Sequence, residues 1–248
     1  MAQIGIHFYQ SLNDFIAPAL DDTEIIYNFE RKASVKDMIE SFNVPHTEVG
    51  RISVNGVAVG FNYIVQDGDR IEVFPAGESF SAMSAGQLRP PLSQPPQFVI
   101  DSNLGRLARY LRLLGFDCLY RNNYNDDTVA RIASEQQRVV LTRDRLLLRR
   151  KIVTHGYFVR ADKPKIQTRE VLKRFALFSL IKPLTRCTHC NGKLAETGKD
   201  RIKHRLEPLT RQYYDKFLMC PDCNWIYWQG SHATRIKQLL DELMDERP

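Results

Sequence analysis

Aspartates stand at three places where a short apolar run gives way to a helical pattern. Asp101 and Asp144 each follow such a run, and Asp126 and Asp127 stand together at the start of another helical stretch. In an open parallel sheet the carboxyl ends of the strands meet at one edge, so we expect these side chains to share a crevice. Clustered carboxylates need a cation, and oxygen ligands suit Mg²⁺ or Mn²⁺.

Each aspartate also has a second interpretation, because Asp is a favoured residue at helix N-caps. Within the adjacent pair we expect Asp126 to be the capping residue and Asp127 to face the site. Three successive strand-to-helix junctions carry Asp inside a basic segment, and this joint pattern favours a site that hydrolyses phosphodiester bonds. Thr142, which precedes Asp144 by two residues, is expected to orient ligands or water there.

Several polar side chains near these acids are candidates for binding a nucleic-acid substrate. The candidate RNA-binding residues are Asn103, Arg106, Arg109, Arg143 and Arg145. Planar guanidinium groups bind phosphate in a forked geometry. Arg112 continues the row formed by Arg106 and Arg109, and we expect it to be a solvated surface residue. From Arg143 to Arg174 there are 11 basic and 3 acidic residues, which suits binding to a phosphate backbone without sequence readout.

Positive charge is concentrated in the C-terminal part of the chain. Residues 1–97 hold 6 Lys/Arg and 12 Asp/Glu, whereas residues 98–248 hold 29 and 17. A basic segment of this size predicts a polyanionic partner, here RNA, for the C-terminal part alone. No stretch approaches the roughly 18 uninterrupted apolar residues of a membrane helix, and the N-terminus has no signal-peptide pattern. We therefore expect a cytoplasmic protein without a membrane partner.

Four of the five cysteines form two CxxC pairs, Cys187 with Cys190 and Cys220 with Cys223. In a cytosolic chain such pairs indicate a metal site rather than disulfides, and four thiolates provide tetrahedral coordination. We expect Zn²⁺, with a redox pair or an iron–sulfur cluster as alternatives. A shell filled by four cysteines leaves no position for substrate, so the metal is expected to be structural. The fifth, Cys118, is expected to be a buried apolar residue.

The elements that must position these residues divide the chain into four segments. They are a β-rich module over residues 1–76, a Pro-rich linker over 77–97, alternating strands and helices over 98–182, and a cysteine-rich segment with a closing helix over 183–248. In the first segment a strand, a helix capped by Ser34, an Asn55-Gly56 hairpin and a late strand predict a β-grasp fold. The repeated strand–helix units of the third predict a three-layer α/β domain with a parallel sheet. The aromatic run Trp225–Trp228 is expected either to stack on bases or to pack the core of the last segment.

Two stretches resemble a known family. VIDSNLGRLARYLRLLGFD with VVLTRDRLL resembles the PIN-like ribonuclease domain named for the C-terminal region of the Mut-seven exonuclease, and RCTHCNG with CPDCNWIYWQGSH resembles the zinc ribbon that follows it. The resemblance implies a metal-dependent ribonuclease in which Asp101, Asp127 (or Asp126) and Asp144 match the clustered acids. Asp162 is the candidate for a fourth acid.

The family often carries an N-terminal ubiquitin-like domain, which residues 2–76 match. This module also resembles sulfur-carrier proteins, but Pro75-Ala76-Gly77-Glu78 replaces their C-terminal Gly-Gly, so we expect an interaction module with an unidentified protein partner. The leading functional hypothesis is Mg²⁺- or Mn²⁺-dependent cleavage of single-stranded RNA. The alternative is a non-catalytic RNA- or ribosome-binding adaptor that uses its aspartates as helix caps.

Overall fold

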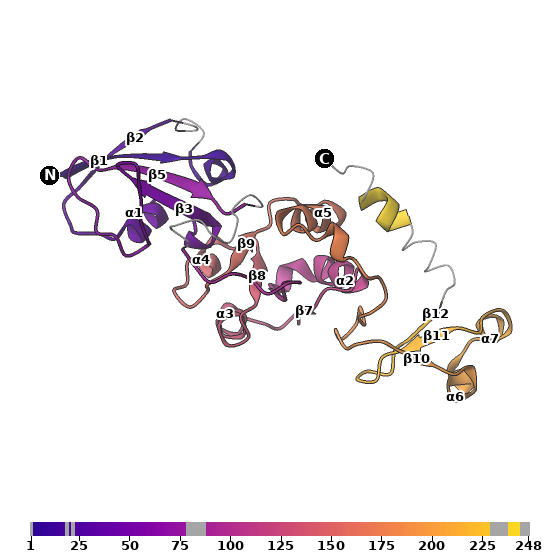
Figure 1. Ribbon diagram of the computed structural model, residues 1–248. Coiled ribbons are helices and arrows are strands. Elements are labelled where there is room, and N and C mark those ends of the chain that lie inside the picture. The colour runs from indigo at the N-terminus through magenta and orange to yellow at the C-terminus, as the bar shows by residue number, and fades with distance from the viewer. Residues whose placement is uncertain (1, 18–19, 21–22, 78–87, 229–237, 244–248) are drawn as a thin grey trace. The chain divides into compact units, whose positions relative to one another are not determined.

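The computed structural model describes residues 2–17, 20, 23–77, 88–228 and 238–243. Two compact units make up the chain. Figure 1 labels the helices and strands. The first consists of Met1–Asn103 and Asn122–Arg160, and the second of Leu104–Arg121 and Ala161–Pro248. Each unit is therefore assembled from two separate stretches of sequence.

The N-terminal module contains a five-stranded sheet with the order β2-β1-β5-β3-β4. Its elements are β1 (Ala2–Phe8), β2 (Ile25–Phe29), α1 (Val35–Ser41), β3 (Val49–Val54), β4 (Val57–Ala58) and β5 (Arg70–Pro75), with 3-10 turns η1 (Gln10–Phe15) and η3 (His46–Glu48). Strands β1 and β5 pair in parallel and the other neighbours are antiparallel. This mixed sheet with one helix is the β-grasp arrangement that the order of elements predicts.

Local sequence signals explain where these elements begin and turn. Ser34 caps α1, because its hydroxyl accepts a hydrogen bond from the backbone N–H of Asp37 at 3.1 Å. Asn55 and Gly56 both have positive φ angles, of 51° and 80°, and join β3 to β4 in a two-residue hairpin. The predicted helix cap and hairpin are both confirmed.

The other strands of the first unit carry the candidate acidic site. Strand β8 (Val139–Thr142) pairs in parallel with β6 (Phe98–Ile100) on one side and with β9 (Gly156–Phe158) on the other. Every residue of β6 and β8 is buried, as is typical of parallel strands covered on both faces. Helices α3 (Asp126–Glu135) and α4 (Arg145–Leu148) belong to the same unit, and the turn η4 (Ser102–Leu104) follows β6.

The second unit joins two helices to a small antiparallel sheet of order β10-β11-β12. Its elements are α2 (Gly105–Leu113), β7 (Cys118–Leu119), α5 (Pro164–Arg174), η5 (Phe178–Leu180), β10 (Ala195–Thr197), α6 (Lys199–Ile202), η6 (Lys203–Arg205), α7 (Pro208–Tyr213), β11 (Phe217–Met219) and β12 (Ile226–Trp228). Helix α2 ends before Gly115, whose φ of 98° is typical of a glycine that follows a helix end. Residues 238–243 are helical, within the predicted closing helix.

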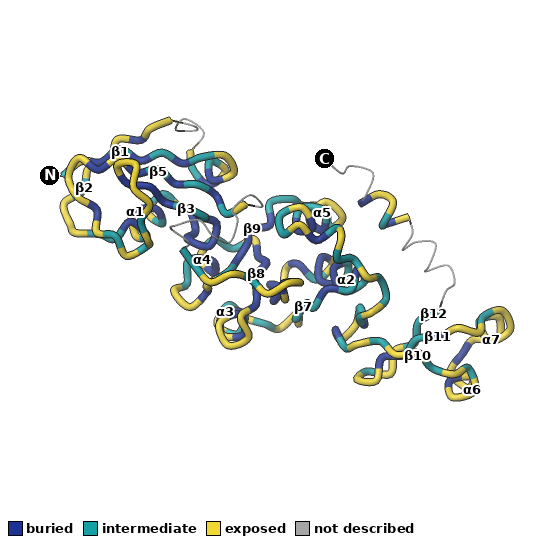
Figure 2. Tube along the Cα trace, viewed as in Figure 1, coloured by how far each residue is buried: buried dark blue, intermediate teal, exposed yellow. Residues whose placement is uncertain are grey.

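Burial is distributed unevenly, as Figure 2 shows. The N-terminal module has sixteen buried apolar residues in its core. The cluster in the ribbon contains only three, Ile202, Leu206 and Phe217, with partly buried neighbours around them. Among the described residues this is a small core, and a metal bound by the four cysteines would add a further constraint to it.

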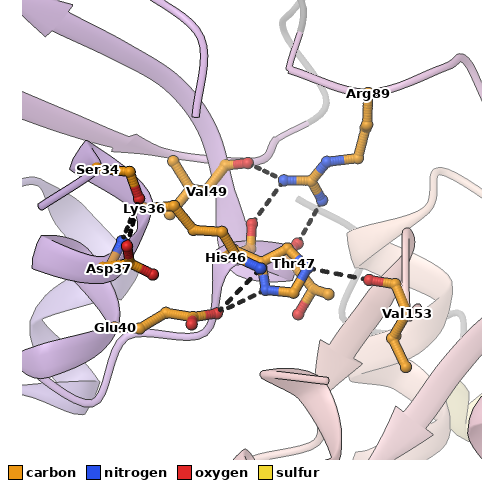
Figure 3. A network of polar contacts seen from close by, with 9 residues as sticks. All are labelled: Ser34, Lys36, Asp37, Glu40, His46, Thr47, Val49, Arg89 and Val153. Carbon is orange, nitrogen blue, oxygen red and sulfur yellow. Dashed lines mark hydrogen bonds and ion pairs between the residues drawn. The ribbon is translucent and has the colours of Figure 1, made fainter. Parts of the chain in front are cut away.

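The N-terminal module contacts the parallel strands of its own unit through the turn η3. The imidazole of His46 lies 2.7 Å from the Glu40 carboxylate and 3.0 Å from the carbonyl oxygen of Val153 (Figure 3). Arg89, from the predicted linker, donates hydrogen bonds to the carbonyl oxygens of residues 46, 47 and 49. This end of the linker is therefore held against the module.

A buried carboxylate completes this interface. Glu48 is only 2% exposed, accepts a hydrogen bond of 2.6 Å from the backbone N–H of Phe158, and lies 3.5 Å from the Arg160 guanidinium. Arg160 also donates to Asp14 at 2.6 Å. The Phe158 side chain packs on the core of the N-terminal module, with its ring 5.5 Å from that of Phe15. Strand β9 is thus bound to the module by both polar and apolar contacts.

We expect Glu48→Ala to destabilise the first unit. The substitution leaves the Phe158 N–H without its acceptor and Arg160 without one of its anions, at a cost of about 2 kcal/mol. The melting temperature should fall by several degrees. Glu30→Ala, at an exposed glutamate of the same module, is the matched control and should change it little. Equal melting temperatures for the two variants would contradict the role given to Glu48.

Candidate functional site

The register of β6 and β8 brings the first two site residues together. Ile100 pairs with Leu141, so the next residues, Asp101 and Thr142, leave the two strands side by side. The Thr142 hydroxyl donates a hydrogen bond of 2.8 Å to one carboxylate oxygen of Asp101, and the Ser102 hydroxyl lies 3.2 Å from the other. Asp101 is only 6% exposed. The side chain is therefore fixed at the carboxyl end of the sheet.

Asp144 is linked to the same threonine. Its backbone N–H donates to the Thr142 hydroxyl at 2.9 Å, so one hydroxyl connects Asp101 and Asp144. Its carboxylate accepts a hydrogen bond of 2.7 Å from the backbone N–H of Leu146 and caps α4. The capping interpretation of Asp144 is therefore correct as geometry, and the residue also lies beside the buried aspartate.

The two aspartates at the start of α3 differ from the roles predicted for them. Asn125 is the N-cap, accepting from the backbone N–H of Thr128 at 2.9 Å, so the expectation that Asp126 is the capping residue is wrong. Asp127 has a side chain that is 81% exposed and forms an ion pair with Arg150. Asp126 is instead the residue whose carboxylate interacts electrostatically with those of Asp101 and Asp144. A helix start supplies one cap position, and the preceding asparagine occupies it.

Electrostatics connects Asp126 to the pair at the strand ends. Partial burial and then the negative charges of Asp144 and Asp101 raise its pKa, against the opposing effect of Arg150. The negative charges of Asp144 and Asp101 thus act on Asp126, and Arg150 offsets this repulsion only in part. A divalent cation bound among the three carboxylates would reduce it further. Among the described residues, however, only the four cysteines bring three or more His, Cys, Asp or Glu ligand atoms close enough to hold a metal. The acids fit a divalent cation by type and charge, but are less tightly gathered than the thiols.

The predicted RNA-binding residues divide between the two units. Asn103 and Arg143 are exposed in the first unit. Arg145 contacts the N-terminal module instead of solvent alone: its guanidinium lies 5.0 Å from the centre of the Phe15 ring and donates to the Phe15 carbonyl at 3.4 Å. Arg106 and Arg109 are exposed on α2 in the second unit.

Asp162, the candidate fourth acid, also belongs to the second unit, where it is exposed.

The four cysteines lie together in the second unit. All their sulfur atoms are within 4.8 Å of one another, and Cys187 to Cys223 and Cys190 to Cys220 are 3.5 and 3.4 Å apart. Burial raises the pKa of the Cys187 thiol, but hydrogen bonds, first from the Tyr227 hydroxyl, outweigh this and lower the pKa to about 7. The thiols of Cys190 and Cys223 shift the other way, because burial raises their pKa. Four sulfur atoms this close together could nevertheless hold a metal such as zinc.

Each CxxC pair is followed by an asparagine in the left-handed conformation. Asn191 and Asn224 have φ angles of 76° and 59°, and their N–H groups donate to the carbonyls of Cys187 and Cys220 at 2.9 and 2.8 Å. At Gly192 an added Cβ would lie 2.9 Å from the Cys220 sulfur. The tight turns and the missing side chain allow the two pairs to approach closely. The repeated Cys-Asn step was the sequence signal for this geometry.

Arg112 is a buried structural residue, so the prediction that it is solvated is wrong. It is 3% exposed and donates to the carbonyl oxygens of Cys118 at 2.9 Å and His189 at 3.0 Å. Burial lowers its pKa, while nearby thiols and Asp117 act in the opposite direction. Arg112 directly follows the buried Leu111, and its position on the inward face of α2 could have indicated this. Its guanidinium connects α2 to the backbone of the first CxxC pair. Cys118 is buried, as expected.

We expect Arg112→Lys to destabilise the second unit by about 2 kcal/mol, because a lysine cannot reach several carbonyl groups with one planar fork. The loss should appear as a lower melting temperature and faster release of bound metal to a chelator. Arg106→Lys, at an exposed position of the same helix, is the control. Metal release at the control rate would contradict the link between Arg112 and the cysteine cluster.

The charge on Asp126 should make the stability of the protein depend on pH. Because its pKa is raised in the folded protein, its ionisation opposes folding, and stability is lost as the pH rises through that raised pKa. Asp126→Asn should therefore increase the melting temperature at pH 7 without divalent cations, and the gain should vanish well below the ordinary carboxyl pKa. Asp127→Asn is the control, because it removes an exposed carboxylate that is paired with Arg150, and it should give no gain. A lower melting temperature for Asp126→Asn at pH 7 would contradict the assignment.

Two family models match the chain. The model of the Mut7-C RNAse domain matches residues 96–240, and that of the Mut7-C ubiquitin domain matches residues 1–81. No curated protein matches the chain. A solved structure from Pyrococcus furiosus, described as a molybdopterin converting factor subunit 1, is 23% identical over 30% of this chain and 98% of its own, with a TM-score of 0.25.

Among the described residues, no helix combines the length and apolar character needed to cross a bilayer. The match to the RNAse domain spans more than half of the sequence, and the ubiquitin domain precedes it. This chain therefore belongs to the Mut7-C RNAse family.

Proposed function

We propose that this protein is a ribonuclease that requires Mg²⁺ or Mn²⁺ and uses Asp101, Asp126 and Asp144. The observation that carries the proposal is the shared contact of Asp101 and Asp144 with the Thr142 hydroxyl. Membership of the Mut7-C RNAse family supports the reaction class. The raised pKa of Asp126 supports its place as the third acid.

The chain contributes orientation and negative charge to this reaction. Thr142 fixes one oxygen of Asp101 by donating a hydrogen bond to it, and Asp144 is held through its backbone and its cap on α4. A bound Mg²⁺ or Mn²⁺ would supply activation of a water molecule and stabilisation of the leaving oxygen. Arg143, exposed and next to Asp144 in sequence, is suited to bind a phosphate of the substrate. These residues would thereby orient the phosphodiester.

RNA is the proposed substrate, and single-stranded RNA is preferred in this proposal. The excess of basic residues in positions 98–248 supports contacts with a phosphate backbone, whose strength should fall steeply with salt.

The proposed structural metal is Zn²⁺, held by the four cysteines in a closed shell. Such a site requires reduced thiols, which supports a cytoplasmic location.

A non-catalytic RNA-binding adaptor is the second candidate. Two observations favour it: the Asp144 carboxylate is engaged as a helix cap, and the acids do not gather as closely as the cysteines. In that case the basic surface would bind RNA and the carboxylates would serve only the fold.

Replacing Asp144 by Asn separates the two candidates, because Asn is as good an N-cap as Asp. The variant should keep its melting temperature while cleavage of RNA with Mg²⁺ or Mn²⁺ falls by orders of magnitude. Asp101→Asn should lose activity similarly, and Asp162→Asn is the control at an exposed acid. Binding of RNA should persist in all three, since less negative charge faces the phosphates.

The measurement is the release of labelled fragments from pooled RNA, beside the melting curve of each variant. Wild-type cleavage by Asp144→Asn would overturn the proposed site. A wild-type protein that binds RNA but cleaves none with either cation would establish the adaptor instead.

A further inference from the structure

The second unit contains a cavity of about 640 Å³ that neither the acidic site nor the cysteine cluster uses. Its wall includes four aromatic residues and two cations: Tyr110, Trp225, Tyr227, Trp228, Arg109 and Lys165. Aromatic faces beside cationic groups form the kind of surface that binds single-stranded nucleic acid. The cavity lies within one unit, where α2, α5 and β12 contribute to it.

The aromatic wall is held in place by the ribbon. The rings of His189 and Trp225 are stacked, with centroids 5.2 Å apart and planes 5° from parallel. Trp225 is nevertheless 53% exposed, so a large ring surface stays open to solvent. The Tyr227 hydroxyl lies 3.2 Å from the Cys187 sulfur and accepts from the Thr188 N–H at 3.0 Å. The first CxxC pair therefore fixes one aromatic side chain and supplies the stacking partner of another.

The positive charge of the second unit favours an anionic ligand for this cavity. The second unit holds 21 Lys/Arg and 12 Asp/Glu over residues 104–121 and 161–248. Arg109 is exposed on α2 at the cavity. Lys165 forms an ion pair of 2.5 Å with Glu242, from the helical residues 238–243. A polyanion with flat apolar rings matches both the aromatic and the cationic part of this wall, whereas an apolar peptide would make no use of the cations.

We propose that this cavity binds an unpaired nucleotide of RNA, with its base stacked on Trp225 and its phosphate at Arg109. The proposal rests on RNA as the substrate of the proposed function and adds a second site for it. A duplex is a poor ligand because its bases are already stacked and cannot offer a free face. Glu242 competes with phosphate for Lys165, so the acidic end of the chain should weaken binding.

The chain offers a specific probe of this site, because it has two tryptophans and both line the cavity. The full-length protein is titrated with oligouridylate of ten nucleotides, and with an RNA duplex of the same length, in buffer without divalent cations. Tryptophan fluorescence should be quenched by the single strand and far less by the duplex. Trp225→Ala should weaken binding about tenfold, and Trp225→Phe should restore most of it.

Two further variants complete the test. Tyr213→Ala removes an exposed aromatic residue of the ribbon that does not line the cavity, and should bind as wild type. Glu242→Gln releases Lys165 and should bind several-fold more tightly at low salt. Metal content and melting temperature of each variant show that the ribbon is intact.

The outcomes separate this proposal from the nuclease proposal. Quenching and a Trp225→Ala defect without any cleavage would support the nucleotide site and remove only the nuclease. Cleavage with a KM that Trp225→Ala leaves unchanged, or wild-type affinity in that variant, would overturn the nucleotide site. Equal quenching by the duplex and the single strand would also overturn it.

Discussion

The in-register parallel pairing of β6 and β8 is the constraint on which the candidate acidic site depends. Because Ile100 lies opposite Leu141, Asp101 and Thr142 emerge together from adjacent strands and form a 2.8 Å hydrogen bond. If the pairing of the two strands were shifted by one residue, the side chains that now lie side by side would point to opposite faces of the sheet. The same threonine then holds the backbone of Asp144. Two apolar strands, fully buried, thus determine where the polar residues of the site lie.

Buried charges join segments that are distant in the sequence. Glu48 binds strand β9 to the N-terminal module across 110 residues, and Arg112 binds α2 to the first CxxC pair across 77. Burying a charge is costly unless it is paired or hydrogen-bonded, so such groups tolerate few alternative arrangements. Both residues therefore favour one specific assembly within their own unit. The N-terminal module is accordingly attached to the parallel strands of its unit, and Arg145 takes part in that attachment.

The cysteine cluster has consequences beyond the metal that it can hold. Among the described residues, the core cluster of the ribbon has three buried apolar side chains. The Cys187 sulfur lies beside the Tyr227 hydroxyl, and His189, within the first CxxC pair, stacks on Trp225. A metal at the four thiolates would therefore stabilise the aromatic wall together with the ribbon. Metal binding and the proposed nucleotide site are then coupled through the backbone of the first CxxC pair, which contacts Tyr227 and carries His189. The acidic site belongs to the other unit.

Local chemistry in the sequence determined much of this protein. The Ser34 cap, the Asn55-Gly56 hairpin, the apolar strands before Asp101 and Asp144, and the two CxxC pairs were all predictable, because each depends on neighbouring residues alone. Only the tertiary structure decided that Asp126, and not Asp127, interacts with the acids at the strand ends. It also decided that Arg112 is buried and that Arg145 contacts Phe15. Adjacent residues of one helix point in different directions, and the direction that becomes buried depends on partners far away in the sequence.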